Sequence, residues 1–307
     1  MFFFENYTLE AVLTIIGLIL LLLLVNEITR RSKWAAICCY IIAPIVLTIF
    51  LWPKSAGAGT SGGYWFAWVK TYSALAGVIG FMAIRYIKRV GNNKYALYFP
   101  FAILTINIIE AIFRDIEVFS IHGEIQNGIF LQGGPWNIIN AIAGIFLVLS
   151  LTGWAGIRIA KTKSKDMIWA DQLWFWIIAY DLWNIAYCYN CISNRAMYAG
   201  VVILVACTVA EIFKRGAWLQ HRAMTLALWA MFSLSYSYAD DKLLFGVTST
   251  HNTNALLVLS VLALIANVSM FGYQVYKMIK TKRNPIIEDL NIDLKAYQKN
   301  LSANGLV

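Results

Sequence analysis

The chain has 307 residues, of which 60% are hydrophobic and 13% charged, and its mean hydropathy is +0.64. Soluble domains contain about 45–50% apolar and about 25% charged residues, so a soluble globular enzyme and a disordered protein are both excluded. The net charge of +9 does not indicate nucleic acid, because the basic residues form short blocks between long apolar segments, as in membrane proteins.

Apolar segments long enough to cross a bilayer recur along the chain. Each has about 18–25 residues, which is the length needed to cross ~30 Å of hydrocarbon. The sequence predicts nine helices, at about 9–28, 34–52, 65–84, 95–113, 136–157, 167–191, 196–213, 217–239 and 254–276. We therefore expect an all-α fold, a polytopic transmembrane helix bundle that occupies residues 1–283.

The basic residues separate into two groups when nine spans are assumed. Twenty of the 25 fall on one side of the membrane, and the five on the other side are Lys54, Lys70, Arg114, Arg195 and Lys242. A missed helix would exchange the sides of every later loop, so this separation supports nine spans. The positive-inside rule then predicts that the N-terminus lies outside and the C-terminus in the cytoplasm.

The tail, residues 284–307, has the pattern of an amphipathic helix that starts near Pro285. Its apolar residues at positions i, i+3, i+7, i+10 and i+14 are Ile287, Leu290, Leu294, Tyr297 and Leu301. We expect this cytoplasmic helix to lie on the inner membrane surface or to dock on the bundle. A contact in a homo-oligomer is the less favoured alternative.

Polar side chains within the predicted spans are the main indication of a functional site, since they are costly in lipid. In the fourth helix Asn107, Glu110 and Arg114 share one stripe, and Glu110 and Arg114 are spaced so that they can neutralise each other. In the sixth helix Asp181 lies close to the middle of the membrane. Five predicted helices are polar in their outer halves and apolar in their inner halves.

This distribution predicts a water-accessible cavity that opens to the outside and ends at Asp181. The structural alternative is that the same groups form hydrogen bonds between helices. The residues predicted to bind a solute or ion are Asn107, Glu110, Arg114, Asn137, Asn140, Asp181, Trp183, Asn184, Tyr187, Tyr236 and Asp240.

The sequence contains no complete motif for metal binding or nucleophilic catalysis. Cys188 and Cys191 have the CxxC spacing, but a pair of thiols is an incomplete zinc site. The three histidines, His122, His221 and His251, are scattered, and no nucleophile elbow is present. The sequence therefore predicts no metal site, no cofactor and no catalytic residue.

Four segments carry a resemblance to a known family: Arg114–Phe119, Gly133–Asn137, Trp174–Asn184 and Gly216–Arg222. In them the chain resembles a family of bacterial multi-spanning membrane proteins that is catalogued as a domain of unknown function. The resemblance covers nearly all predicted spans and implies a location in the bacterial cytoplasmic (inner) membrane, but no activity. The Trp- and Asn-rich lining is loosely similar to that of nicotinamide riboside and SWEET-type sugar transporters.

Three functions are compatible with these features. The first is a membrane transporter of a small polar or cationic solute, or an ion, in which Glu110, Asp181 and either Asp240 or Asp241 bind the cation or a coupling proton. The alternatives are an integral membrane enzyme that acts on a lipid-linked substrate at the outer leaflet, and an ion channel or sensor. Since no metal-ligand cluster or nucleophile motif favours an enzyme, and the inner halves are apolar, we predict the transporter, with the bilayer and a small solute as its partners.

Overall fold

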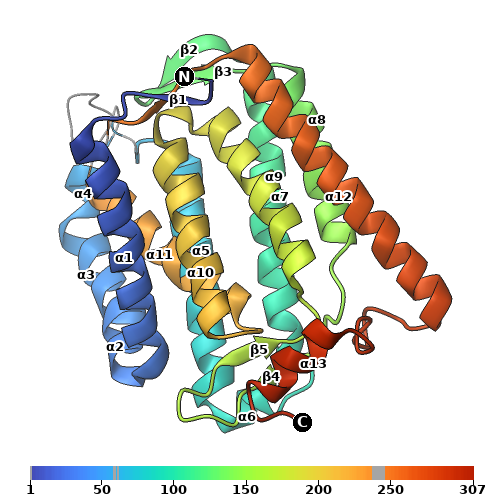
Figure 1. The fold of residues 1–307 in the computed structure, drawn as a ribbon. Coiled ribbons are helices and arrows are strands. Elements are labelled where there is room, and N and C mark those ends of the chain that lie inside the picture. The colour runs from blue at the N-terminus through green and yellow to red at the C-terminus, as the bar shows by residue number, and fades with distance from the viewer. Residues whose placement is uncertain (1, 58–59, 61, 237–245) are drawn as a thin grey trace.

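The structure, a computed structural model, describes residues 2–57, 60, 62–236 and 246–307 and is mostly helical. The helices stand side by side and run between two ends of the molecule (Figure 1). We call the end that carries the N-terminus the upper end. The end that carries the C-terminal tail is the lower end.

The helices of the bundle occupy the regions that the apolar pattern predicts. They are α1 (Leu9–Arg31), α2 (Lys33–Ile37), α3 (Ala43–Phe50), α5 (Trp65–Tyr86), α7 (Phe99–Phe119), α8 (Pro135–Leu149), α9 (Trp174–Cys191), α10 (Ile203–Phe213), α11 (Trp218–Ser235) and α12 (Thr253–Thr281). The segment Cys38–Ile42 continues α2 into α3 as a turn of π-helix, and Ala196–Val202 does the same before α10. The short helices are α4 (Trp52–Ser55), α6 (Lys88–Gly91) and α13 (Lys295–Ser302).

In the described part of the chain, six helical segments are long and apolar enough to cross a membrane. They are Leu9–Arg31, Lys33–Phe50, Trp65–Tyr86, Ala96–Phe119, Ser193–Phe213 and Thr253–Thr281. Helix α8 is apolar but has 15 residues, while α9 and α11 have 18 residues each and carry more polar side chains. The count of nine spans therefore stays a prediction.

The boundaries between the fifth and sixth predicted helices are wrong. Helix α8 ends at Leu149 and α9 begins at Trp174, and between them strands β4 (Ile157–Ile159) and β5 (Met167–Trp169) form an antiparallel hairpin. Short apolar runs such as these fit a strand as well as a helix, so periodicity alone could not separate the two. The hairpin lies at the lower end of the bundle (Figure 1).

Two further strand pairs lie at the upper end (Figure 1). Strands β2 (His122–Gln126) and β3 (Ile129–Gln132) are joined by Asn127 and Gly128, which both have positive φ angles, as a tight hairpin turn requires. Strand β1 (Phe4–Glu5) pairs with β6 (Thr248–Ser249) and so ties the N-terminus to the start of α12.

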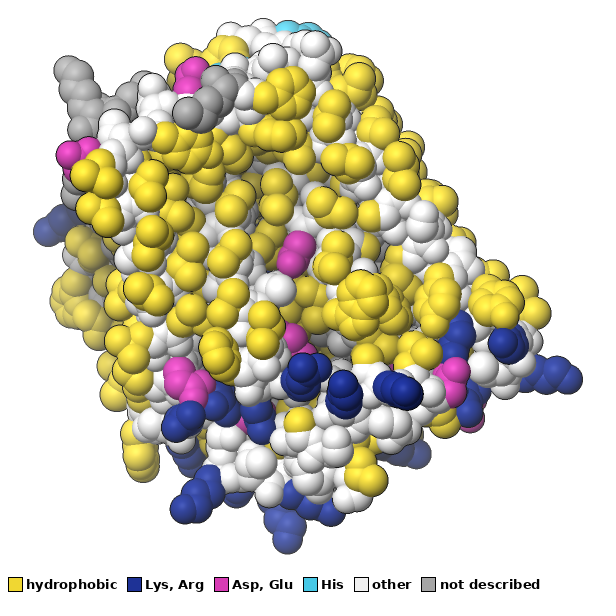
Figure 2. Space-filling view, in the orientation of Figure 1, with side chains coloured by type: hydrophobic (Ala, Val, Ile, Leu, Met, Phe, Trp, Pro, Cys, Tyr) yellow, Lys and Arg dark blue, Asp and Glu magenta, His cyan; other side chains and the backbone are white. Residues whose placement is uncertain are grey.

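The surface of the bundle matches a lipid environment. Hydrophobic side chains cover its flanks, and Lys and Arg side chains gather at the lower end (Figure 2). On helix α1, for example, the exposed residues include Leu13, Leu20 and Leu24. Such an apolar flank would be unfavourable in water and is typical of helices that face lipid.

The C-terminal tail contains a shorter helix than the sequence predicts. Turns occupy most of residues 285–294, and α13 covers only Lys295–Ser302. The Asp171 carboxylate accepts hydrogen bonds from the backbone N–H groups of Leu290 (3.0 Å) and Asn291 (2.8 Å). Tyr297 is buried against Ile168 and Leu173 at the base of the bundle. The tail thus docks on the β4–β5 region.

Candidate functional site

A cavity of about 70 Å³ lies between α5, α9 and α11 in the interior of the bundle. Its wall contains several polar and charged side chains among apolar ones. The described residues that line it are Tyr64, Phe66, Ala67, Lys70, Thr71, Asn184, Tyr187, Cys188, Ile192, Arg195, Ala199, Arg222, Leu226, Trp229, Ala230 and Ser233. We call this space the upper cavity.

Arg222 forms the lower part of this wall, about one turn above the start of α11. Its side chain is buried, its Nε donates to the Tyr180 hydroxyl (3.2 Å), and its Nη2 donates to Oδ1 of Asn184 (3.2 Å). The guanidinium also lies 5.7 Å from the centre of the Tyr180 ring. Within the described chain, Nη1 has no hydrogen-bond partner and no carboxylate lies within ion-pair distance.

Lys70 on α5 is the second basic group of the upper cavity. Its Nζ donates to the backbone oxygen and to Oδ1 of Asn107, both at 2.9 Å, and lies 3.5 Å from Oε2 of Glu110. The hydroxyl of Ser73 also donates to Glu110. Because α5 packs against α7, Lys70 faces the polar stripe that the sequence predicts on α7.

The predicted pair between Glu110 and Arg114 is wrong. Glu110 points to Lys70, whereas Arg114 forms an ion pair with Glu117 at 2.7 Å and lies 5.5 Å from the centre of the Tyr64 ring. A spacing of four residues brings two side chains to the same side of a helix. It does not decide between that partner and one supplied by a neighbouring helix.

Asn137 and Asn140 belong to a separate polar cluster. Their side-chain nitrogens donate to the two carboxylate oxygens of Asp115, at 3.0 and 2.8 Å, and the Cys191 thiol donates to the same carboxylate at 3.2 Å. All four side chains are buried, which matches the structural alternative of hydrogen bonds between helices. Asp115 is the centre of this cluster, although it is not among the site residues that the sequence predicts.

Asp181 does not form the floor of the upper cavity. It lies on the side of α9 that faces α10, is only partly buried, and accepts a hydrogen bond from the Thr208 hydroxyl (3.0 Å). Its neighbours one turn away along that side, Ile178 and Ile185, are exposed or partly exposed. The cavity-facing side of α9 carries Asn184 and Tyr187 instead, so the place that we predicted for Asp181 is taken by Arg222 of α11.

The remaining predicted site residues lie in different places. Asn184 and Tyr187 line the upper cavity as expected, and Trp183 packs beside it, with its indole N–H donating to the backbone oxygen of Asn140 (3.1 Å). Tyr236 follows the end of α11 and stacks on Phe232. Asp240 and Asp241 lie outside the described residues.

A second, smaller cavity of about 30 Å³ continues below the first. It shares Arg222 and Leu226 with the upper cavity and is otherwise mostly apolar. Its other lining residues are Ser73, Ala74, Gly77, Phe81, Ile103, Leu104, Asn107, Tyr180, Leu219 and Ala223. Together the two spaces follow α11 from Leu219 to Ser233, a rise of ~21 Å, and the guanidinium of Arg222 stands between them.

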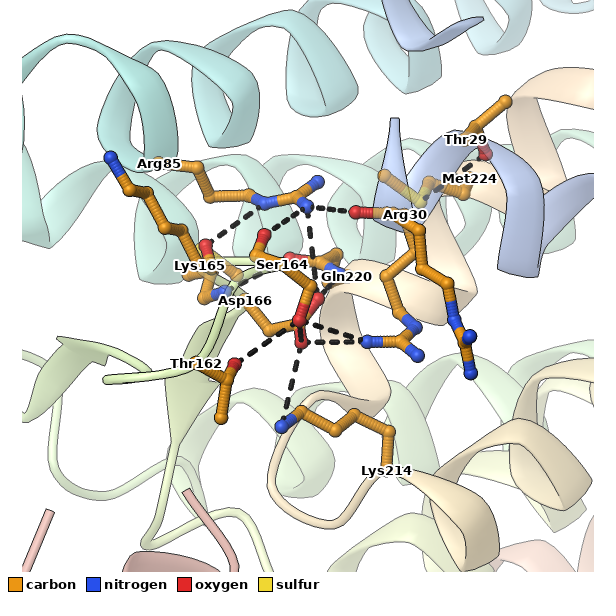
Figure 3. A network of polar contacts seen from close by, with 12 residues as sticks. Thr29, Arg30, Arg85, Thr162, Ser164, Lys165, Asp166, Lys214, Gln220 and Met224 are labelled. Carbon is orange, nitrogen blue, oxygen red and sulfur yellow. Dashed lines mark hydrogen bonds and ion pairs between the residues drawn. The ribbon is translucent and has the colours of Figure 1, made fainter. Parts of the chain in front are cut away.

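A third charged cluster lies at the lower end, around Asp166 (Figure 3). The buried carboxylate contacts Arg30 of α1 (2.8 Å), Arg85 of α5 (3.7 Å) and Lys214 at the end of α10 (3.6 Å). Gln220 of α11 and Ser164 donate hydrogen bonds to it at 3.0 and 2.6 Å. One side chain of the β4–β5 loop thereby connects four helices, a role that its position in a polar loop does not reveal.

The environment of Asp166 keeps its carboxyl ionised. Burial by itself raises the pKa of this group, but the charges of Arg30 and Arg85 and the hydrogen bonds of Ser164 and Gln220 outweigh that effect and lower the pKa. A buried carboxylate held by several cations is typical of a structural ion network. We therefore assign the candidate binding site to the upper cavity and not to this cluster.

Comparison with known proteins gives one match. No curated protein and no solved structure matches the chain. A family model, described as a family of unknown function (DUF5692), matches residues 5–303, which is nearly the whole chain and includes both cavities and the Asp166 cluster. The chain belongs to this family, DUF5692.

Proposed function

We propose that this protein is a membrane transporter of a small polar solute and that the upper cavity is its solute-binding site. The observation that carries the proposal is the pair of cavities along α11, with Arg222 between them. A solute site near the middle of a helical bundle, closed on one side by a side chain, is the arrangement that alternating access requires. Intramembrane ionisable residues also mark transport pathways more often than structural sites.

The proposed topology has nine spans, with the upper end outside and the lower end in the cytoplasm of a bacterial cell. The concentration of Lys and Arg at the lower end supports this orientation through the positive-inside rule (Figure 2). The short helix α8, about 22 Å long, fits because the β2–β3 and β4–β5 hairpins extend the chain beyond its two ends. In this orientation the upper cavity lies on the outer side of Arg222.

The two ends of the pathway can be probed with a matched pair of cysteine variants on α11. Ala230 lines only the upper cavity and Ala223 only the lower one. In a chain without its five native cysteines, we expect Ala230→Cys to react with a membrane-impermeant thiol reagent added outside the cell. Ala223→Cys is expected to react only from the cytoplasmic side, in inside-out vesicles.

The outcomes separate the functions that the sequence left open. Reaction of Ala223→Cys from outside the cell as well as from the cytoplasmic side indicates a continuous channel, which contradicts a transporter. Reaction of Ala230→Cys from outside and of Ala223→Cys from neither side indicates a one-sided pocket, as in an enzyme or sensor. A transporter requires reciprocal access, by which we mean that the upper cavity is reached from outside the cell and the lower cavity from the cytoplasmic side. A solute that the protein carries should also protect Ala230→Cys from the reagent.

A further inference from the structure

Among the residues that the structure describes, the wall of the upper cavity carries an excess of positive charge. Arg222, Lys70 and Arg195 line it, and none of the described lining residues is acidic. Glu110 lies behind Lys70 at 3.5 Å and balances one positive charge at most. A buried guanidinium without a carboxylate partner is strongly unfavourable in a medium of low polarity, and a bound anion would supply the balancing charge.

Hydrogen-bond donors without partners occur on the same wall. Across the described chain, Nη1 of Arg222 and the hydroxyl of Tyr187 are buried and have no partner. The other guanidinium nitrogens are already used by Tyr180 and Asn184, which hold the group in place. Nη1 is thus the donor that remains for a ligand. A planar guanidinium of this kind binds carboxylate and phosphate oxygens well.

We propose that the upper cavity binds a small anion that carries a carboxylate or a phosphate group, with Arg222 and Lys70 as its charged ligands and Tyr187 as a neutral donor. This inference rests on the proposed solute site and names its substrate class. It replaces the cationic solute of the sequence-based hypothesis, because a cation in this cavity would face Arg222 and Lys70 with no acidic group among the described lining residues to bind it.

Binding can be measured on the full chain in detergent without any transport. We expect inorganic phosphate or acetate to raise the thermal unfolding temperature saturably, compared with chloride at equal ionic strength, since a ligand that binds only the folded state stabilises it. Choline chloride, as a small organic cation, is expected to have no saturable effect. A response to phosphate alone or to acetate alone identifies the preferred group.

Variants of Arg222 and Glu110 test the assignment. Arg222→Gln should abolish the saturable response. Arg222→Lys should weaken the apparent affinity by about tenfold, because it keeps the charge but loses the Nη1 donor and the contacts with Tyr180 and Asn184 that hold the guanidinium in place. Glu110→Gln should tighten binding, since it removes the carboxylate that competes for Lys70. Arg89→Gln, which removes an exposed basic residue at the lower end, is the matched control and should respond as the parent does.

Two results would overturn the inference: no saturable response of the parent protein to either anion, or the same response in Arg222→Gln as in the parent. If Arg222→Gln does not fold, the test rests on Arg222→Lys and Glu110→Gln. An affinity for the anion that is unchanged in both variants contradicts the assigned anion site. If the protein binds the anion but the cysteine variants show no reciprocal access, the anion site is supported and the proposed transport function is contradicted. If the variants show reciprocal access but no anion binds, the transport function is supported and the proposed anionic substrate is contradicted.

Discussion

Lys70 and Arg222 lie in parts of the sequence that suggest the edges of the membrane, yet both side chains line the central cavity. Each is held by neutral groups of a neighbouring helix: Asn107 accepts from Lys70, and Tyr180 and Asn184 accept from Arg222. Glu110 is the one carboxylate in ion-pair contact with either of them among the described residues. The charge of the cavity therefore depends on a few residues that can be changed one at a time.

Glu110→Gln should lower the stability of the protein. It leaves Lys70 without its carboxylate in a largely buried position, and breaking a buried pair costs about 3 kcal/mol. We expect a clear fall in the thermal unfolding temperature, followed by tryptophan fluorescence in detergent. Glu124→Gln is the control, because that carboxylate is exposed on the β2–β3 hairpin and forms no ion pair among the described residues. Equal stability of Glu110→Gln and the parent would contradict the assigned pair.

At the scale of elements, the β4–β5 hairpin and the tail together close the lower end of the bundle. Asp166 of the hairpin connects to α1, α5, α10 and α11, while Asp171 and Arg158 connect the same region to the tail. Neither connection follows from helical periodicity, because each joins a loop to residues that are far away in sequence. Both connections depend mainly on carboxylates, so neutral variants can separate their contributions.

Asp166→Asn should destabilise the whole bundle by about 3–5 kcal/mol, because Arg30 and Arg85 lose their shared counter-charge. The pKa of Asp166 is lowered on folding, so its contribution is present above the unfolded value of 3.8 and is lost as the pH falls further. The parent should therefore lose stability below about pH 4 more steeply than the variant.

Thermal unfolding as a function of pH measures both effects. The control is Glu124→Gln, which removes an exposed carboxylate of the β2–β3 hairpin that forms no ion pair among the described residues. This control should change the unfolding temperature little. An Asp166→Asn protein as stable as the control at neutral pH would show that the network contributes nothing.

Asp171→Ala should release the tail without unfolding the bundle. The carboxylate accepts hydrogen bonds from the Thr152 hydroxyl and from two backbone N–H groups of the tail. Each hydrogen bond to a charged group contributes about 1.5–3 kcal/mol. We expect trypsin to cut at Lys295 and Lys299 at least about tenfold faster, as seen by mass spectrometry. Glu288→Ala, which changes an exposed carboxylate of the same segment, should leave the cutting rate unchanged.

At the scale of the whole molecule, the arrangement of charge supports the orientation that we propose. Lys and Arg side chains concentrate at one end of an otherwise apolar surface (Figure 2). The N-terminus lies at the opposite end, and the tail lies at the basic end (Figure 1). The topology that we propose from the positive-inside rule places the upper cavity toward the outside and the Asp166 cluster toward the cytoplasm.

Cysteine labelling in intact cells tests that orientation. In a chain without native cysteines, Lys163→Cys in the β4–β5 loop should resist a membrane-impermeant reagent and react only after the cells are opened. Glu124→Cys in the β2–β3 hairpin, which is equally exposed at the other end, should react in intact cells. Modification of Lys163→Cys in intact cells would reverse the proposed topology.

Local features were predictable from the sequence because they depend on residues close together in the chain. Long apolar runs predict the helices, and the pattern of Lys and Arg predicts which loops share an end, since both follow from transfer free energies and short-range geometry. The hairpin turn at Asn127-Gly128 is local in the same way, because it depends on two adjacent residues that adopt positive φ angles.

The partners of the polar side chains were decided only by tertiary structure. Helical periodicity shows which residues share a face, but not which helix that face meets. Thus Glu110 faces Lys70 rather than Arg114, Asn137 and Asn140 bind Asp115, and Asp181 lies outside the cavity that Arg222 enters. These contacts join residues 22 to 42 positions apart, and only the packing of the helices brings them together.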